Sequence, residues 1–331
     1  MSGRIKAAVR PIALPCIHAW QRFWDNSRTT VRLGPGRLRE MLLNFRFSRR
    51  ALGKAVPILE DINGTRFVLY PWDRPTAGKL VRRRHDTADF RAISKLMRPG
   101  FVAFDVGANV GIHSVLLSQL CKPDGRVWAF EPVPETYWRL KETLALNRCE
   151  NVATVQAAIC DKTGTAEMNL FESRFSEWNS LGNPSMYGTD GNRISPTLHV
   201  KVPTQTLDQF CKSEGIEYIH FLKVDVEGFE LTVFRGAAQI LTERRVDCIC
   251  FEISAEPLRG AGIESKDVFE ALESYGYRAY RFDERLDAFT GPVTDSLDSW
   301  TNFFASWRDL RDLQKWHETR EDRNWLRSVP A

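Results

Sequence analysis

Residues 102–111, with the sequence VAFDVGANVG, constrain the fold more than any other stretch of the chain. A short apolar strand runs into an acidic residue, Asp105, and then into a turn in which Gly107 and Gly111 have a G-x-x-x-G spacing. Glycines in such a turn let the backbone bend tightly and bring its amides close to a ligand. Asn109 stands where a dinucleotide fingerprint has its second glycine. The turn therefore predicts an adenosyl ligand without phosphates and disfavours a nicotinamide dehydrogenase.

Apolar strands alternate with helical stretches through the centre of the chain, an order that predicts a parallel sheet with helices on both faces. The expected strands are 102–105, 126–131, 152–157, 219–225 and 246–253. The expected helices are 114–120, 135–147, 207–213, 229–241 and 268–275. Two further strands, near 278–282 and 301–305, are expected to close the sheet as an antiparallel hairpin.

The 331 residues divide by pattern into four segments. We expect a basic N-terminal extension (1–56), a hairpin and helix that lead into the core (57–98), a core domain (99–306) and a charged C-terminal tail (307–331). The hairpin turns at Asn63-Gly64, a pair that suits a type I′ turn. Up to Lys54 there are twelve Lys/Arg residues against two acids.

The basic extension contains an amphipathic pattern over residues 38–52. Such a helix either docks its apolar stripe on the main domain or lies on an anionic membrane surface. No apolar run approaches the roughly 20 residues of a transmembrane helix, and the seven cysteines include no C-x-x-C pair. We therefore expect a cytoplasmic protein, with contact to the inner face of the membrane through residues 1–54 as an alternative. Nucleic acid is a disfavoured partner, since no basic stripe is interleaved with aromatic residues.

Four core strands end in, or next to, an acid: Asp105, Glu131, Asp225 and Glu252. Because a ligand binds at the carboxyl ends of the strands of an open parallel sheet, these acids should gather along one rim. Glu131 lies 20 residues beyond Gly111, a spacing at which a carboxylate binds ribose hydroxyls. Glu227 and Glu230 also suit a structural role, since acids are favoured at helix starts.

A series of motifs, taken in order, resembles the FkbM family of S-adenosylmethionine-dependent methyltransferases over about residues 99–255. The motifs are FDVGANVGIHS, GRVWAFEPVPETYWRLKETLALN, ICDKTGTAEMNL, VPTQTLDQF, FLKVDVEGFELTVFRGAAQIL and FEIS. The resemblance implies a Rossmann-like class I methyltransferase fold, with a mostly parallel seven-stranded sheet and an antiparallel terminal hairpin. It also implies a hydroxyl of a sugar, glycolipid or other small molecule as the acceptor.

The same resemblance assigns the cofactor-binding residues. Asp105, Gly107, Asn109 and Gly111 would form the loop at the methionine side of S-adenosylmethionine. Glu131 would hold the ribose, and Asp161 would lie near the adenine amino group. The glycine spacing and the position of Glu131 independently indicate the same roles for the loop and for Glu131. The Asp-Lys-Thr-Gly sequence at Asp161 also suits a plain turn.

Methyl transfer to an alcohol requires an in-line arrangement of oxygen, carbon and sulfur, and the loss of a proton from the alcohol. We predict Asp225 and Glu227 as the catalytic residues, with Asp225 as the base because the fourth strand adjoins the first. Alternatively, Glu227 and Glu252 join Asp225 as oxygen ligands of Mg²⁺, or Asp225 only orients the amides of the next helix. Lys223, inside the fourth strand, is costly to bury alone and should pair with an acid.

Residues 171–197 show no clear period, and a connection of this length is usually a lid, a binding loop or a solvated insertion. Trp178, Asn179 and Ser180 are therefore candidate contacts of the acceptor. A second interpretation of the whole chain is a non-catalytic S-adenosylmethionine-binding component of a membrane-associated assembly, suggested by the basic extension.

Overall fold

The computed structural model of the protein describes residues 29–33, 55–60, 65–68, 88–171, 179–181, 186–187, 193–296 and 301–312. The chain forms two compact units, Met1–Arg84 and His85–Ala331. In the first unit, β1 (Thr29–Leu33) pairs in parallel with β2 (Ala55–Glu60), and β2 pairs antiparallel with β3 (Arg66–Val68). The amphipathic pattern over 38–52 lies outside the described residues, and the four sequence-based boundaries stay predictions.

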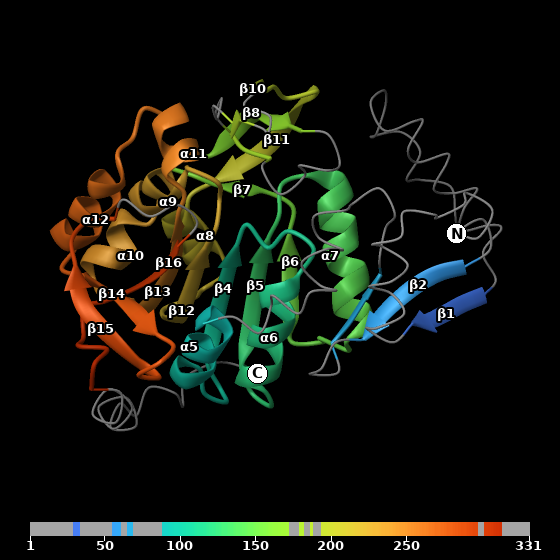
Figure 1. The fold of residues 1–331 in the computed structure, drawn as a ribbon, viewed down its shortest axis with the longest axis horizontal. Helices are drawn as coiled ribbons and strands as arrows, with labels where there is room; N and C mark the ends of the chain where they lie inside the picture. Colours follow the sequence, from blue (N-terminus) through green and yellow to red (C-terminus); the bar gives the residue numbers. More distant parts are fainter. Residues whose placement is uncertain are drawn as a thin grey trace. The chain divides into compact units, whose positions relative to one another are not determined.

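The second unit contains one eight-stranded sheet, in the order β15-β14-β16-β13-β12-β4-β5-β6 (Figure 1). Its parallel strands are β4 (Val102–Val106), β5 (Arg126–Phe130), β6 (Val152–Val155), β12 (Ile219–Val224) and β13 (Val246–Ile253). From β4 the chain adds β5 and β6 on one side, whereas β12 and β13 lie on the other. The strand order therefore reverses between β4 and β12, which is where an open α/β sheet has its ligand crevice. The expected doubly wound fold is confirmed.

The sheet has one strand more than the seven expected. Strands β14 (Arg278–Asp283) and β16 (Thr301–Ser306) pair antiparallel as predicted, and β16 lies between β14 and β13. The additional strand, β15 (Ala288–Val293), forms an antiparallel hairpin with β14. It contains Gly291 and Pro292, which are unfavourable inside most strands, but β15 is an edge strand, where proline is tolerated because the outer side of the strand needs no donor.

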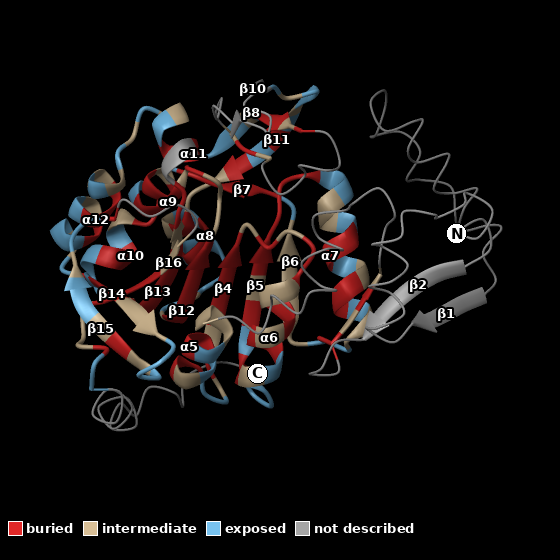
Figure 2. Cartoon of the chain, viewed as in Figure 1, coloured by how far each residue is buried: buried red, intermediate tan, exposed pale blue. Residues whose placement is uncertain are grey.

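Helices cover both faces of this sheet. The helices are α5 (Ala88–Leu96), α6 (Ile112–Cys121), α7 (Pro134–Leu146), α8 (Leu207–Ser213), α9 (Glu230–Arg235), α10 (Ala238–Thr242), α11 (Ala255–Gly260) and α12 (Ser265–Ser274). Alternate residues of each strand point to opposite faces. On one face, Phe104 belongs to a buried cluster with residues of α8, α9, α10 and α12, whereas on the other face Ala103 belongs to a cluster with residues of α5 and α6. Both faces are buried, and the central strands are accordingly apolar along most of their length (Figure 2).

The helix expected over 229–241 is instead two helices, α9 and α10, which meet at Gly236. The backbone of Gly236 packs against the Cys160 carbonyl, so closely that a Cβ there would lie 2.0 Å from the oxygen. Glycine is a weak helix former, and here it is required by a contact distant in the sequence. The sequence pattern alone could not reveal that contact.

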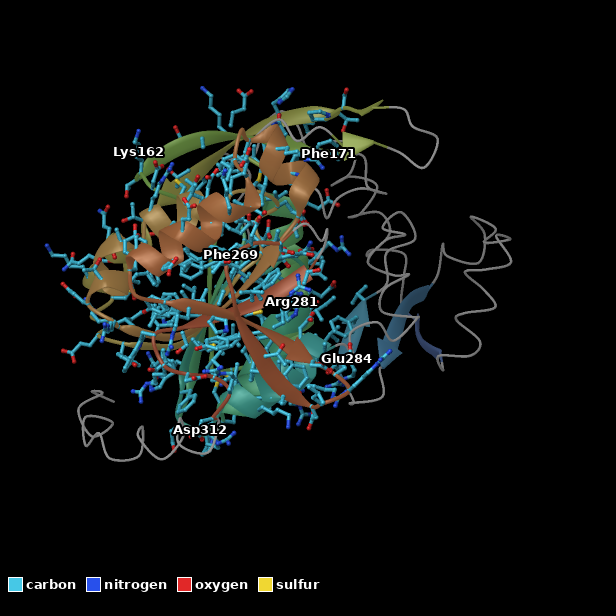
Figure 3. The ribbon with its side chains drawn as sticks, turned by 60° about the vertical axis from the view of Figure 1, so that its left-hand side comes forward. Lys162, Phe171, Phe269, Arg281, Glu284 and Asp312 are labelled. Atoms are coloured by element: carbon cyan, nitrogen blue, oxygen red, sulfur yellow. The ribbon has the colours of Figure 1, made fainter. Side chains whose placement is uncertain are left out.

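A smaller sheet, in the order β7-β11-β8, lies beyond the carboxyl ends of β4 and β5 (Figure 1). It comprises β7 (Ala158–Ile159), β8 (Gly164–Leu170) and β11 (Leu198–Gln205), and Figure 3 labels Lys162 and Phe171, which flank β8. A separate antiparallel pair joins β9 (Met186–Tyr187) to β10 (Arg193–Ile194). Among the described residues, no helix has the length and apolar character required to cross a membrane.

Candidate active site

The two loops at the reversal point of the sheet touch through their backbones. Gly107 follows β4 and Asp225 follows β12, its neighbour in the sheet. A Cβ built on Gly107 would lie 1.9 Å from the carbonyl oxygen of Asp225, and Gly107 also has a left-handed φ of 81°. Only glycine satisfies both conditions without displacing one of the loops. The predicted cofactor turn and the predicted catalytic acid are therefore adjacent.

The glycine turn uses left-handed backbone at three alternate positions. Gly107, Asn109 and Gly111 have φ angles of 81°, 49° and 92°. Asparagine is one of the few other residues that adopt this conformation readily, which explains why Asn109 can replace a glycine here. The amides of Gly107 and Ala108 donate to the carbonyl of Phe130 at 3.1 and 2.9 Å. The turn is thus fixed to the end of β5 before α6 begins.

Asp105, just before the glycine turn, contacts α6 and β12 from inside the protein. Its side chain is fully buried, and Oδ2 accepts a hydrogen bond from the Ser114 hydroxyl of α6 at 2.5 Å. Burial raises the pKa of Asp105, although Lys223 and Ser114 act to lower it. The motifs of the sequence do not indicate this role of Ser114, and its only sequence signal is its place in the first turn of the helix after the glycine turn.

Glu131 lies at the end of β5 with both carboxylate oxygens facing backbone amides. Oε2 accepts from the Asn109 amide at 3.0 Å and Oε1 from the Val133 amide at 2.9 Å. Burial raises the pKa of Glu131 to about 7, against the lowering effect of the two amides. One carboxyl group therefore bridges the glycine turn and the start of α7. With a pKa of about 7, it changes between the protonated and the ionised form near neutral pH.

Three carboxyl groups gather where β12 and β13 end. One oxygen from each of Asp225, Glu227 and Glu252 lies within 4.8 Å of the others. Oδ2 of Asp225 also accepts from Lys223 Nζ at 2.9 Å, which confirms that the buried lysine pairs with an acid. Burial would raise the pKa of Asp225, but Lys223 and a hydrogen bond with Glu252 lower it to about 2. Burial and the Asp225 charge raise the pKa of Glu252 well above its usual value.

The turn after Asp225 is held from two sides. Glu227 has a left-handed φ of 51°, unusual for a glutamate, and Gly228 follows with 93°. Oε1 of Glu230 accepts from the amides of Val226 and Gly228, both at 3.3 Å. The Ser180 hydroxyl donates to the Glu227 carbonyl at 3.0 Å. Glu230 thus serves the structural role expected of an acid at a helix start.

The predicted acceptor contacts lie where the long insertion rejoins β8. Trp178 is outside the described residues. Oδ1 of Asn179 accepts from the Phe171 amide at 3.0 Å. Ser180 is buried and directs its hydroxyl to the Glu227 turn, so its observed partner is the protein backbone. Asp161 is exposed at a bend after β7. The acceptor and adenine roles of these residues stay predictions.

The sequence of this chain is similar to those of known methyltransferases. A family model described as the methyltransferase FkbM domain matches residues 105–279, more than half of the chain. The 2-O-methyltransferase NoeI of Sinorhizobium fredii is 25% identical over 207 residues, which cover 61% of this chain and 80% of NoeI. The hexuronic acid methyltransferase AglP of Haloferax volcanii is 28% identical over 176 residues, covering 52% of this chain and 61% of AglP.

Among solved structures, the O-methyltransferase of Bacillus cereus aligns with a TM-score of 0.38 and 10% identity. That alignment covers 82% of this chain and 88% of the other. The family match spans the glycine turn, Glu131, Asp161 and the Asp225 turn, and it ends in β14. This chain belongs to the FkbM methyltransferase family.

Proposed function

We propose that this protein is an S-adenosylmethionine-dependent O-methyltransferase that methylates a hydroxyl of a sugar, glycolipid or other small molecule. The observation that carries the proposal is the contact between the glycine turn and the turn that presents Asp225, an ionised acid. The names of the relatives support the acceptor class, since one specifies a 2-O-methyltransferase and another a hexuronic acid.

In this proposal the cofactor lies along the rim from β12 to β5. Asp105, Gly107, Asn109 and Gly111 hold its methionine side, and Asp161 lies near the adenine. Each oxygen of Glu131 accepts one amide hydrogen bond, which leaves each oxygen a second acceptor site for a ribose hydroxyl. This arrangement supports the assignment of Glu131 to the ribose.

Asp225 would orient the acceptor hydroxyl and take its proton. S-adenosylmethionine, when bound, supplies the methyl group and keeps the electron pair of the broken carbon–sulfur bond on its sulfur. As the acceptor oxygen forms its new bond to carbon it becomes strongly acidic, so a carboxylate with a pKa of about 2 is a sufficient base. The low pKa ensures that Asp225 is ionised and ready at neutral pH.

Incubation with S-adenosylmethionine labelled in the methyl group, and with fractionated glycans and glycolipids, tests the proposal. We expect label in a neutral or acidic sugar product as an alkali-stable methyl ether, which mass spectrometry can locate. Label in protein or nucleic acid would overturn the acceptor class. An absence of cofactor binding by calorimetry would overturn the proposal as a whole.

The affinity for S-adenosylmethionine should fall as the pH is lowered below about 7. Ribose hydroxyls donate to ionised Glu131, and burial raises the pKa of this residue to about 7 in the free protein. Acidification protonates the carboxyl and removes acceptor sites, so Kd should rise by up to about tenfold per pH unit. Calorimetric titrations between pH 5.5 and 8 measure the effect.

Glu131→Gln should flatten this pH profile and weaken binding at pH 8, because the amide replaces one acceptor oxygen by a donor. Glu150→Gln, at an exposed turn, is the matched control and should keep the wild-type profile. A wild-type affinity independent of pH over this range would remove Glu131 from the ribose site.

The alternative function, a non-catalytic component of a membrane-associated assembly, depends on the basic residues up to Lys54. It would be supported by co-sedimentation of the full chain with anionic vesicles, lost on deletion of residues 1–54, without methyl transfer to any fraction. Methyl transfer by the full chain would contradict it.

A further inference from the structure

The ammonium group of a buried lysine, Lys223, lies among the acids at the carboxyl ends of the strands. Lys223 is only 2% exposed near the carboxyl end of β12, and its Nζ lies 2.9 Å from Oδ2 of Asp225 and 3.9 Å from Oδ1 of Asp105. A lysine is seldom buried in this way unless carboxylates surround its ammonium group. Lys223 therefore connects the acid under the glycine turn to the acid proposed as the base.

The sheet register places these groups on one face. Lys223 is directly beside Asp105 of β4 and Cys250 of β13. Because side chains two residues apart share a face, Asp225 and Glu252 lie on that face as well. Helices α5 and α6 cover it. From these helices, the charges of Asp89 and His113 act on Cys250 and Asp225 respectively.

We propose that Lys223 is the positioning residue of Asp225. Its ammonium group provides the positive charge beside the carboxyl groups of Asp225, Glu227 and Glu252, so that methyl transfer needs no divalent cation. The inference rests on the proposed function, in which Asp225 takes the proton of the acceptor. The ammonium fixes one carboxylate oxygen from within the sheet. The carboxylate is thereby held next to the glycine turn.

The three clustered carboxyl groups resemble a Mg²⁺ site in ligand type, but their existing partners fit a cation poorly. Oδ2 of Asp225 already accepts from Lys223 at 2.9 Å, so one of the three carboxylates is engaged by an ammonium group. Mg²⁺ demands an octahedral set of oxygens, and an ammonium beside Asp225 would repel it. The charge of Asp225 is instead balanced by the ammonium group of Lys223.

Cation binding can be measured on the full-length protein before any acceptor is identified. We expect a titration with Mn²⁺, followed by electron paramagnetic resonance, to show no stoichiometric site, whether or not S-adenosylmethionine is bound. Stoichiometric Mn²⁺ binding that disappears in Glu252→Gln would overturn the proposal. This readout needs no methyl transfer, and cofactor binding is recorded separately, so failure of the proposed function is distinguished from failure of this inference.

The role of Lys223 is tested by Lys223→Met and Lys223→Gln, with Lys212→Met on the exposed face of α8 as the matched control. We expect kcat to fall by about 100-fold or more, while Kd for S-adenosylmethionine and KM for the acceptor change by less than about threefold. Wild-type rates should be equal in EDTA and in Mg²⁺.

A Lys223→Met protein with wild-type kcat would overturn the positioning role, as would a folded variant that loses cofactor binding and activity together. A wild-type rate abolished by EDTA and restored by Mg²⁺ would overturn the metal-free assignment. Where the lysine variants do not fold, the Mn²⁺ and EDTA measurements on the wild-type protein still decide that assignment.

Discussion

Replacement of Asp225 by asparagine should lower kcat of methyl transfer by about 10²–10⁴-fold, the usual contribution of a general base. The amide cannot take the acceptor's proton, and it also loses the ion pair with Lys223. Cofactor affinity should change little, because the cofactor is expected to contact the glycine turn and Glu131. Steady-state kinetics with labelled S-adenosylmethionine and calorimetry of cofactor binding measure the two quantities separately.

Asp124→Asn is the control for this variant, because Asp124 is an exposed residue in the turn before β5. It should behave as the wild type in both measurements. Retention of more than about a tenth of wild-type kcat by Asp225→Asn would exclude Asp225 as the general base. In that case its role would be restricted to orienting the turn that precedes α9.

Replacement of Gly107 by alanine should abolish detectable cofactor binding and destabilise the protein. The new Cβ would lie 1.9 Å from the Asp225 carbonyl oxygen, which is backbone and cannot rotate away. The left-handed φ of 81° adds about 1–2 kcal/mol for an L-residue, and overpacking adds about 1–3 kcal/mol. Urea unfolding monitored by circular dichroism gives the loss of stability.

Gly215→Ala separates these two costs. Gly215 also has a left-handed φ, of 65°, but a Cβ there would meet nothing within 4 Å. It should lose only about 1–2 kcal/mol and keep full cofactor affinity. Equal behaviour of the two variants would show that backbone strain, rather than the contact with Asp225, makes glycine necessary at position 107.

Much of the fold could be predicted because each core strand has its own apolar run, and four of these strands end in, or next to, an acid. Helix α8 begins at Leu207 and ends at Ser213, as expected. The structure differs from the sequence-based expectations where contacts between residues distant in the sequence decide the local structure. Strand β8 is stabilised by pairing with β11, more than twenty residues away, and Gly236, between α9 and α10, lies against the distant Cys160 carbonyl. Neither partner is visible in a local pattern.

Some residues of the candidate site could likewise be predicted from the sequence, and others could not. Strand order alone indicated that Asp105, Glu131 and Asp225 would share a rim, and burial cost alone indicated an acid partner for Lys223. The Ser114 hydroxyl on Asp105 and the Ser180 hydroxyl on the Glu227 carbonyl depend on distances between loops and helices. Small hydroxyl side chains occur throughout the sequence, so their partners become evident only in three dimensions.

The bond between Asn179 and the Phe171 amide closes the first part of the long insertion at its base. Ser180 is bound next to it, by backbone pairing with Asn169 and by its hydroxyl to the Glu227 turn. The entropy of loop closure rises by only about 0.6 kcal/mol for each doubling of length. We therefore expect that residues 172–178 can be exchanged for segments of other lengths and sequences while Asn179 and Ser180 keep their bonds to Phe171 and to the Glu227 turn.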